Sequence, residues 1–120
     1  MVKLKRCIEN PLLSPDFRNV WERGAVFNPS VAKCGREFIM LYRAATKVQR
    51  LPGDFVNVSS IGSASGFDAV HFSNRELFFA PEYGYEAYGC EDPRISKLGG
   101  EYYVFYTAVA DVPPKPSDVR

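Results

Sequence analysis

The sequence predicts an all-β fold assembled from repeated four-stranded sheets, like the blades of a β-propeller. The main observation is an internal repeat: residues 28–44 recur without a gap as residues 92–108, with Pro, Lys, Gly, Glu, Tyr and Ala identical at matched positions. Within each copy, apolar and polar residues alternate and turn residues separate the runs, which is typical of short strands. Repeated units of this kind must stack on neighbours to bury their faces.

The first unit is predicted to contain four strands, at residues 25–34, 37–45, 55–64 and 70–72. A turn at residues 34–36 separates the first two strands. A hairpin at residues 66–68 separates the last two, because its Gly and Asp tolerate the backbone angles of a tight turn.

The second unit is predicted to repeat only the first two strands, at residues 91–98 and 101–109, after a crossover at residues 73–90. Since propellers close with about 4 to 8 blades, residues 1–120 are expected to form the N-terminal part of a single propeller domain. That part holds about one and a half blades, which lie at about residues 25–72 and 89–110. Residues 111–120 contain three prolines and are predicted to be a loop or a ragged end.

Composition agrees with a folded globular domain and excludes several classes of function. Apolar residues make up 46% of the chain, and 15 basic residues balance 14 acidic ones. Such a balance does not favour binding to nucleic acid. No apolar run approaches the roughly 20 residues of a membrane span, and no signal peptide is recognisable, so a cytoplasmic protein without membrane contact is expected.

The three cysteines, Cys7, Cys34 and Cys90, are an odd number without a close pair. This pattern predicts neither a disulfide framework nor a metal or redox site. Cys90 could be a nucleophile, but the only histidine, His71, lies in a turn-rich segment and shows no sign of serving as its base. We therefore expect buried, reduced thiols and no bound metal.

Two polar residues, Asn28 and Asp92, occupy the same position of the repeat, directly before a proline. Proline lacks a backbone donor and restricts the preceding residue to extended conformations, so both side chains are predicted to stand at the rim of a central funnel on extended backbone. Polar groups from several blades would converge there on one small molecule. The alternative is that both are ordinary turn residues, because Asn-Pro and Asp-Pro commonly initiate turns.

Arg43 interrupts an apolar run, and its repeat partner is Thr107. An unpaired guanidinium is costly to bury, whereas its planar fork of donors suits sugar hydroxyls or an anion. Arg43 is therefore a candidate binding residue. It could also pair with Glu91 or Asp92 for structure alone.

The order of these motifs resembles the five-bladed β-propellers of glycoside hydrolase family 130, which contains β-mannoside phosphorylases and β-mannosidases. The matching motifs are Glu9–Leu13, Val26–Pro29, Leu41–Ala44, Ser60–Ser65, Cys90–Ile95 and Tyr106–Ala108. The resemblance implies inverting phosphorolysis of β-mannosides to mannose 1-phosphate, with inorganic phosphate as co-substrate and no cofactor. It also implies a phosphate site formed by later blades.

The resemblance implies a role for each matched site residue. Asp92 would be the proton donor, acting through a hydroxyl of the bound mannose. Asn28 and Arg43 would hold the non-reducing mannose, and Glu91 and Arg94 would support and orient them.

Physical chemistry leaves alternatives open. A general acid must keep its proton near neutral pH, through partial burial or a neighbouring carboxylate, and Glu86 and Glu91 are candidate neighbours of Asp92. Inverting hydrolysis needs two carboxylates; Glu82 or Glu86 could supply the second, or both could lie in a solvated loop.

The candidate functions are a β-mannoside phosphorylase, a hydrolase of the same family, and a catalytically silent carbohydrate-binding fragment. We also expect self-association through the exposed blade edge.

Overall fold

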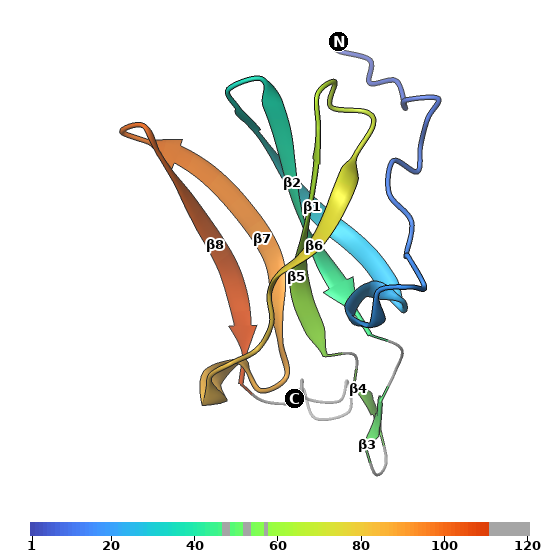
Figure 1. Ribbon diagram of the computed structural model, residues 1–120, viewed down its shortest axis with the longest axis vertical. Coiled ribbons are helices and arrows are strands. Elements are labelled where there is room, and N and C mark those ends of the chain that lie inside the picture. The colour runs from blue at the N-terminus through green and yellow to red at the C-terminus, as the bar shows by residue number, and fades with distance from the viewer. Residues whose placement is uncertain (47–48, 52–53, 57, 111–120) are drawn as a thin grey trace.

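The computed structural model describes residues 1–46, 49–51, 54–56 and 58–110, and it confirms an all-β fold (Figure 1). The elements are η1 (Val20–Glu22), β1 (Ala25–Cys34), β2 (Glu37–Ala45), β3 (Gln49–Leu51), β4 (Asp54–Val56), β5 (Ser59–Gly66), β6 (Ser73–Phe79), η2 (Gly84–Glu86), β7 (Gly89–Leu98) and β8 (Glu101–Val109). Within the described part of the chain, no helix is long and apolar enough to cross a membrane. The predicted loop at residues 111–120 lies outside the described residues.

Strands β1, β2, β5 and β6 form one antiparallel sheet in sequence order, and among the described residues β3 pairs only with β4. The β7–β8 hairpin joins this sheet through one parallel bridge between Ser59 and Gly89. In Figure 1 the hairpin diverges from the first sheet above this junction. The described residues thus form a complete four-stranded unit followed by the first two strands of another.

The sequence repeat is also a repeat of strand register. In β1 and β2, Ala25 lies opposite Ala45, and the pairing shifts between Phe27 and Ser30. In β7 and β8 the same shift occurs between Glu91 and Arg94. The strands predicted at residues 25–34, 37–45 and 101–109 are confirmed, and the strand predicted at 91–98 begins two residues earlier, at Gly89.

The third and fourth strands differ from the prediction. β5 begins at Ser59 instead of residue 55, because residues 54–56 pair with β3. The predicted strand at residues 70–72 is wrong: these residues form a turn, and β6 lies within the segment predicted as a crossover. Asp68 shapes this turn by accepting hydrogen bonds from the backbone N–H groups of Val70 and His71, at 2.9 and 2.8 Å.

The hydrophobic core consists of two clusters on opposite faces of β2, as expected from the alternation of side chains along a strand. The first contains Met40, Tyr42, Ala44 and Ala64, and the N-terminal residues Leu13 and Trp21 pack against it. The second contains Leu41, Ile61 and Cys90, with Ile95 and Val104 packed against it. Because the second cluster takes residues from both repeats, it packs the two units against each other.

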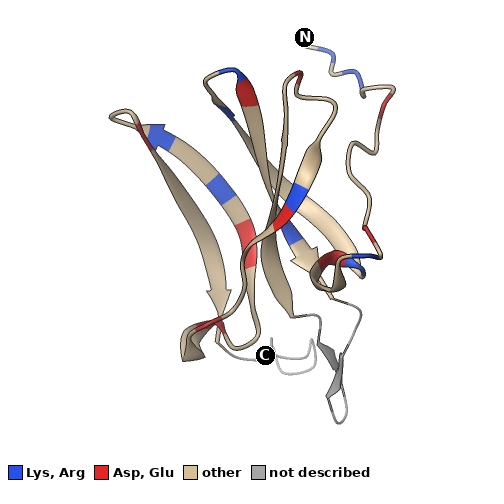
Figure 2. Ribbon diagram, in the orientation of Figure 1, with Lys and Arg blue, Asp and Glu red and all other residues tan. Residues whose placement is uncertain are grey.

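A buried carboxylate anchors the N-terminal segment to the first sheet. Glu22 in η1 is fully buried and accepts hydrogen bonds from the Tyr42 hydroxyl at 2.9 Å and the Asn19 amide at 2.6 Å. Arg75 of β6 lies 3.5 Å from the same carboxylate, and Figure 2 shows η1 and β6 carrying these opposite charges. Burial, followed by the bond to Glu22, raises the pKa of Tyr42. Through Tyr42, these contacts fix the position of β2, the strand that also carries Arg43.

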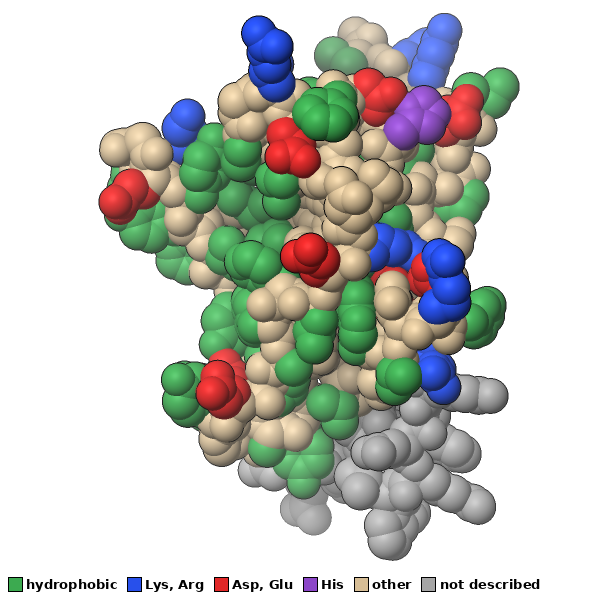
Figure 3. Space-filling view, viewed as in Figure 1, with side chains coloured by type: hydrophobic (Ala, Val, Ile, Leu, Met, Phe, Trp, Pro, Cys, Tyr) green, Lys and Arg blue, Asp and Glu red, His purple; other side chains and the backbone are tan. Residues whose placement is uncertain are grey.

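One face of β8 is open. Tyr103 and Phe105 are the repeat partners of Ile39 and Leu41, but Phe105 is 63% exposed whereas Leu41 is 2% exposed. Figure 3 shows hydrophobic side chains on the side of the molecule formed by β7 and β8. Among the described residues, β8 pairs only with β7. This apolar face therefore lacks the cover that β7 gives to the first unit.

Candidate functional site

The candidate site is built on the two register shifts. Between Phe27 and Ser30, β1 has two residues where β2 has one, which defines a β-bulge, and β7 has the same bulge at Asp92. Asn28 and Asp92 have φ angles of 50° and 51°, in the left-handed region. The prediction of extended backbone at these positions is wrong. Asn and Asp are the residues other than Gly that tolerate this region best, which explains their presence at the bulges.

The bulges bring the two polar side chains together across the junction between the units. The Asn28 side-chain amide donates a hydrogen bond to Asp92 Oδ1 at 2.7 Å. A second link, from the Ile95 backbone N–H to Ser30 Oγ at 3.0 Å, holds β1 and β7 side by side. Asn28 is exposed and the Asp92 side chain is 42% exposed, so a ligand can reach both.

Arg43 joins this pair from β2. Its Nη2 donates to the Glu91 carboxylate, and its Nη1 lies 3.7 Å from Asp92 Oδ1. Its Nε donates to Ser59 Oγ at 2.8 Å, and the guanidinium lies over the Phe27 ring, 4.7 Å from the ring centroid. The structure therefore brings Asn28, Arg43, Glu91 and Asp92 into one cluster.

The cluster combines an amide, two carboxylates and a guanidinium, which hydrogen bonds and ion pairs hold in place. Glu91 compensates the charge of Arg43, and both side chains are about one-fifth exposed, at 22% and 19%. Partial burial strengthens such charged hydrogen bonds relative to those in water. Amides, carboxylates and guanidinium groups together satisfy both the donors and the acceptors of a polyhydroxyl ligand.

Arg94 lies outside this cluster. Its side chain is exposed and donates to the Pro93 backbone carbonyl at 2.8 Å. Among the described residues it forms no side-chain hydrogen bond or ion pair with Asn28, Arg43, Glu91 or Asp92. The supporting role that the resemblance implies for Arg94 stays a prediction.

Glu86 is a structural residue of the loop that contains η2. It is buried and accepts hydrogen bonds from the Tyr106 hydroxyl and from the backbone N–H groups of Glu82 and Tyr83, the last two at 2.9 and 3.1 Å. The Tyr106 bond is the main cause that lowers the pKa of Glu86. A lowered pKa keeps this group ionised at neutral pH, and its hydrogen bonds engage both carboxylate oxygens within the loop and with Tyr106. Glu82 is exposed in the same loop.

Cys90 is fully buried between the two units. Burial is the main cause that raises the pKa of its thiol to about 11, so the thiol is neutral at physiological pH. His71 is exposed and pairs with Asp68, at 2.6 Å. Cys7, Cys34 and Cys90 are all free, but only Cys90 is buried. The expectation of buried thiols is wrong for Cys7, which is exposed, and for Cys34, which is partly exposed. Cys90 has none of the features of an activated nucleophile.

Sequence reasoning missed two residues of the cluster, Ser59 and Phe27. Both contact Arg43, and Ser59 is fully buried. The sequence feature that could have identified Ser59 is its position two residues before Ile61. This spacing places both side chains on the same face of β5. That face could be identified only once the pairing of Ile61 with Arg43 was known.

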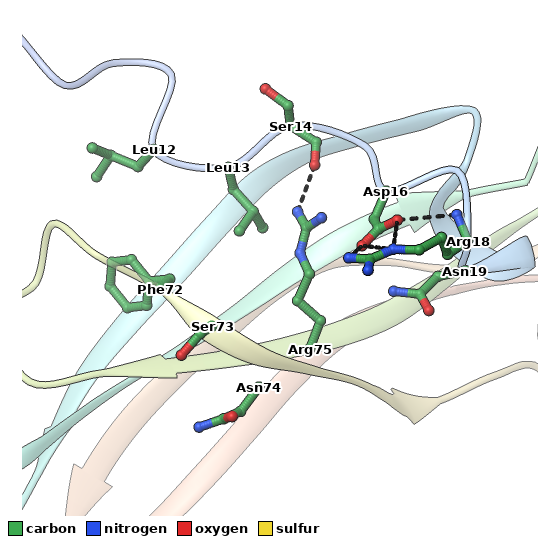
Figure 4. Close-up of a pocket in the computed structure, with 10 residues that line it drawn as sticks. All are labelled: Leu12, Leu13, Ser14, Asp16, Arg18, Asn19, Phe72, Ser73, Asn74 and Arg75. Atoms are coloured by element: carbon green, nitrogen blue, oxygen red, sulfur yellow. Dashed lines mark hydrogen bonds and ion pairs between the residues drawn. The ribbon is translucent and has the colours of Figure 1, made fainter.

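A cavity of about 690 Å³ lies elsewhere, between the N-terminal segment and β6 (Figure 4). Arg75 crosses it and donates to the Ser14 carbonyl at 2.6 Å, and Arg18 pairs with Asp16 at 2.7 Å. Arg18 and Asp16 therefore occupy each other, and Arg75 is held by the Ser14 carbonyl and by Glu22. None of the residues of the Asn28–Asp92 cluster lines it.

Comparison with known proteins identifies a family for this chain. A family model described as β-1,4-mannooligosaccharide phosphorylase, glycoside hydrolase family 130, matches residues 5–115. A curated β-1,2-mannobiose phosphorylase from Thermoanaerobacter sp. (strain X514) is 38% identical over 116 residues, and the match covers 89% of this chain and 37% of that protein. The chain therefore spans little more than a third of the length of this relative.

Two solved structures have a similar fold. The first is described as part of a GH130 family of mannoside phosphorylases that contains hydrolases targeting β-1,2 mannosidic linkages in Candida mannan. It is 30% identical with a TM-score of 0.72, and the match covers 85% of this chain and 33% of that one. The second, a β-1,2-mannobiose phosphorylase from Listeria innocua in complex with β-1,2-mannobiose, is 24% identical with a TM-score of 0.73, covering 88% and 44%. The second likeness supports the fold alone.

Proposed function

The chain belongs to glycoside hydrolase family 130, and we propose that the complete protein is a five-bladed β-propeller that cleaves β-mannosides with inorganic phosphate. The observation that carries this proposal is the meeting of Asn28 and Asp92, at equivalent bulges of two stacked units, with Arg43 of β2. The names of the curated relative and of the first structural relative favour β-1,2-linked mannosides as substrates. The proposal assigns the phosphate site to later blades of the complete protein.

In the proposed mechanism, Asn28 and Arg43 bind hydroxyl groups of the non-reducing mannose. Asp92 donates a proton toward the glycosidic oxygen through a hydroxyl of that mannose. Phosphate attacks the anomeric carbon from the opposite face, the glycosidic bond breaks, and the leaving sugar keeps the donated proton. A phosphorylase needs only one protein carboxyl group for this reaction, because the second reactant is phosphate.

A β-mannoside hydrolase of the same family is the second candidate, since one structural relative is described as belonging to a family that includes such hydrolases. Hydrolysis with inversion requires a second carboxylate to activate water. Glu86 is occupied by its loop and by Tyr106, so a hydrolase would need this group from Glu82 or from outside the described residues. The phosphorylase is therefore the simpler proposal.

The experiment is to incubate the complete protein with β-1,2-mannobiose, with and without inorganic phosphate, and to identify the products by NMR. The proposal predicts α-mannose 1-phosphate and mannose, formed only when phosphate is present. Equal release of free mannose without phosphate would identify a hydrolase instead. Absence of turnover under both conditions would contradict both candidates for this substrate.

A further inference from the structure

Arg43 is held at three points by residues from three strands. Glu91 of β7 accepts from Nη2, the Phe27 ring of β1 lies against one face, and Ser59 of β5 accepts from Nε. The ion pair and the ring restrain the outer part of the guanidinium. Ser59 holds the inner end, where the planar group joins its aliphatic stem, and so limits rotation of the whole plane.

Ser59 is well placed to hold Arg43. It is not accessible for direct contact with a ligand. Its side chain is fully buried, and its backbone bridges to Gly89 where the two units meet. Space there is tight, because a Cβ added at Gly89 would lie 3.0 Å from the Ser59 nitrogen. A buried hydroxyl at a fixed junction can influence a ligand only through the residue that it contacts, Arg43.

The position of Arg43 leaves one of its donor groups available. Nη1 lies 3.7 Å from Asp92 Oδ1, which is beyond the usual 2.7–3.2 Å of a hydrogen bond. A small rotation of the guanidinium would close this gap and form a direct Arg43–Asp92 pair. Such a pair would occupy both groups that the proposed mechanism assigns to the sugar.

We infer that Ser59 is a positioning residue that keeps the Arg43 guanidinium directed at the sugar and separate from Asp92. This inference rests on the proposed function. It adds a buried serine, from a strand that carries no other residue of the cluster, to the determinants of sugar binding. Ser59 acts through Arg43 and is not itself in contact with the substrate.

The matched control is Ser60, the next residue, which is 7% exposed and belongs to the opposite face of β5 because side chains alternate along a strand. In the complete enzyme with β-1,2-mannobiose and phosphate, Ser59→Ala should raise KM about tenfold, since a displacement of about 1 Å in a positioned group can cost up to about 10²-fold. The turnover number should fall much less than KM rises. Ser60→Ala should leave both unchanged.

A second measurement does not depend on activity. In ¹⁵N-labelled protein, the Nε–H signal of Arg43, assigned by its loss in Arg43→Lys, should exchange slowly with solvent in the wild type and in Ser60→Ala. In Ser59→Ala the exchange should be about tenfold faster or more, because the buried acceptor is gone. Failure of the wild type to cleave the substrate would refute the proposed function. The exchange rates would still show whether Ser59 holds the Arg43 Nε–H group. Wild-type KM in an active Ser59→Ala enzyme would overturn the inference.

Discussion

At the scale of single residues, the site depends on the chemical identity of Arg43. Its guanidinium contacts Ser59, Glu91 and the Phe27 ring at the same time, and its Nη1 stays near Asp92. A planar group with several fixed donors can make these contacts together, whereas an ammonium group cannot. The requirement is therefore for an arginine, and charge alone is not enough.

We expect Arg43→Lys in the complete enzyme to raise KM by roughly tenfold or more, since hydrogen bonds to charged groups contribute about 1.5–3 kcal/mol. Steady-state kinetics would measure this effect. Arg36→Lys, in the exposed turn between β1 and β2, serves as the control. Unchanged kinetics in Arg43→Lys would show that the ion pair with Glu91 has only a structural role.

Glu86 provides a pH-dependent test, also at the residue scale. Its hydrogen bonds lower its pKa below the ordinary value of 4.5. The resulting stabilisation is fully present above pH 4.5 and is lost as the pH falls through the lowered pKa of the folded state. Glu86→Gln should therefore lower Tm most at neutral pH, and the difference from wild type should narrow toward pH 3.

Thermal unfolding of both proteins between pH 7 and pH 3 would measure this difference. Glu82→Gln, on the exposed part of the same loop, should have little effect at any pH. A difference between wild type and Glu86→Gln that stays constant across this range would contradict the assignment of Glu86 as a buried, ionised cap.

At the scale of elements, the β-bulge directs the site residues. Both bulges place a non-glycine residue in the left-handed region, which costs about 1–2 kcal/mol for most L-residues. Asn28→Ala and Asn28→Gly both remove the amide that contacts Asp92. They differ mainly in how well each residue tolerates the left-handed backbone.

Asn28→Gly should therefore be more stable than Asn28→Ala by about 1 kcal/mol, although the two variants lose substrate binding to a similar degree. Urea unfolding and KM measurements on the same preparations would check both parts. Equal stability of the two variants would contradict the left-handed conformation at the bulge.

The sequence predicted those elements that the repeat itself defines. The bounds of β1, β2 and β8 follow from two aligned copies, and the clustering of Asn28 with Asp92 follows from their equivalent positions. β6 was missed because it is an edge strand whose residues are mostly exposed, so its sequence lacks an apolar alternation. The left-handed backbone was missed because the rule for residues before proline favours extended structure, and the bulge overrides it.

At the scale of the whole molecule, the repeat explains why one face of β8 is open. In the first unit, Leu41 is covered by Cys90 and Ile95 of the second. The same face of the second unit presents Tyr103 and Phe105, at 44% and 63% exposure. A further unit, stacked as the second stacks on the first, would cover these rings, in agreement with the greater length of the relatives.

The 120-residue chain by itself should therefore self-associate through this face. Light scattering after size-exclusion chromatography should show an oligomer, which Phe105→Ser weakens. Phe67→Ser is the matched control, because Phe67 is 76% exposed and lies in the turn before β6. A monomer at every concentration tested would refute this expectation.

The most direct test of the account is Asp92→Asn in the complete protein, assayed for release of mannose 1-phosphate from β-1,2-mannobiose and phosphate. The amide is nearly isosteric, so Tm should be retained, whereas turnover should fall by roughly 10²–10⁴-fold, as is usual for the loss of a general acid. A substrate whose leaving group needs little protonation should be affected less. A folded Asp92→Asn enzyme with wild-type turnover would contradict the assignment of Asp92 as the proton donor.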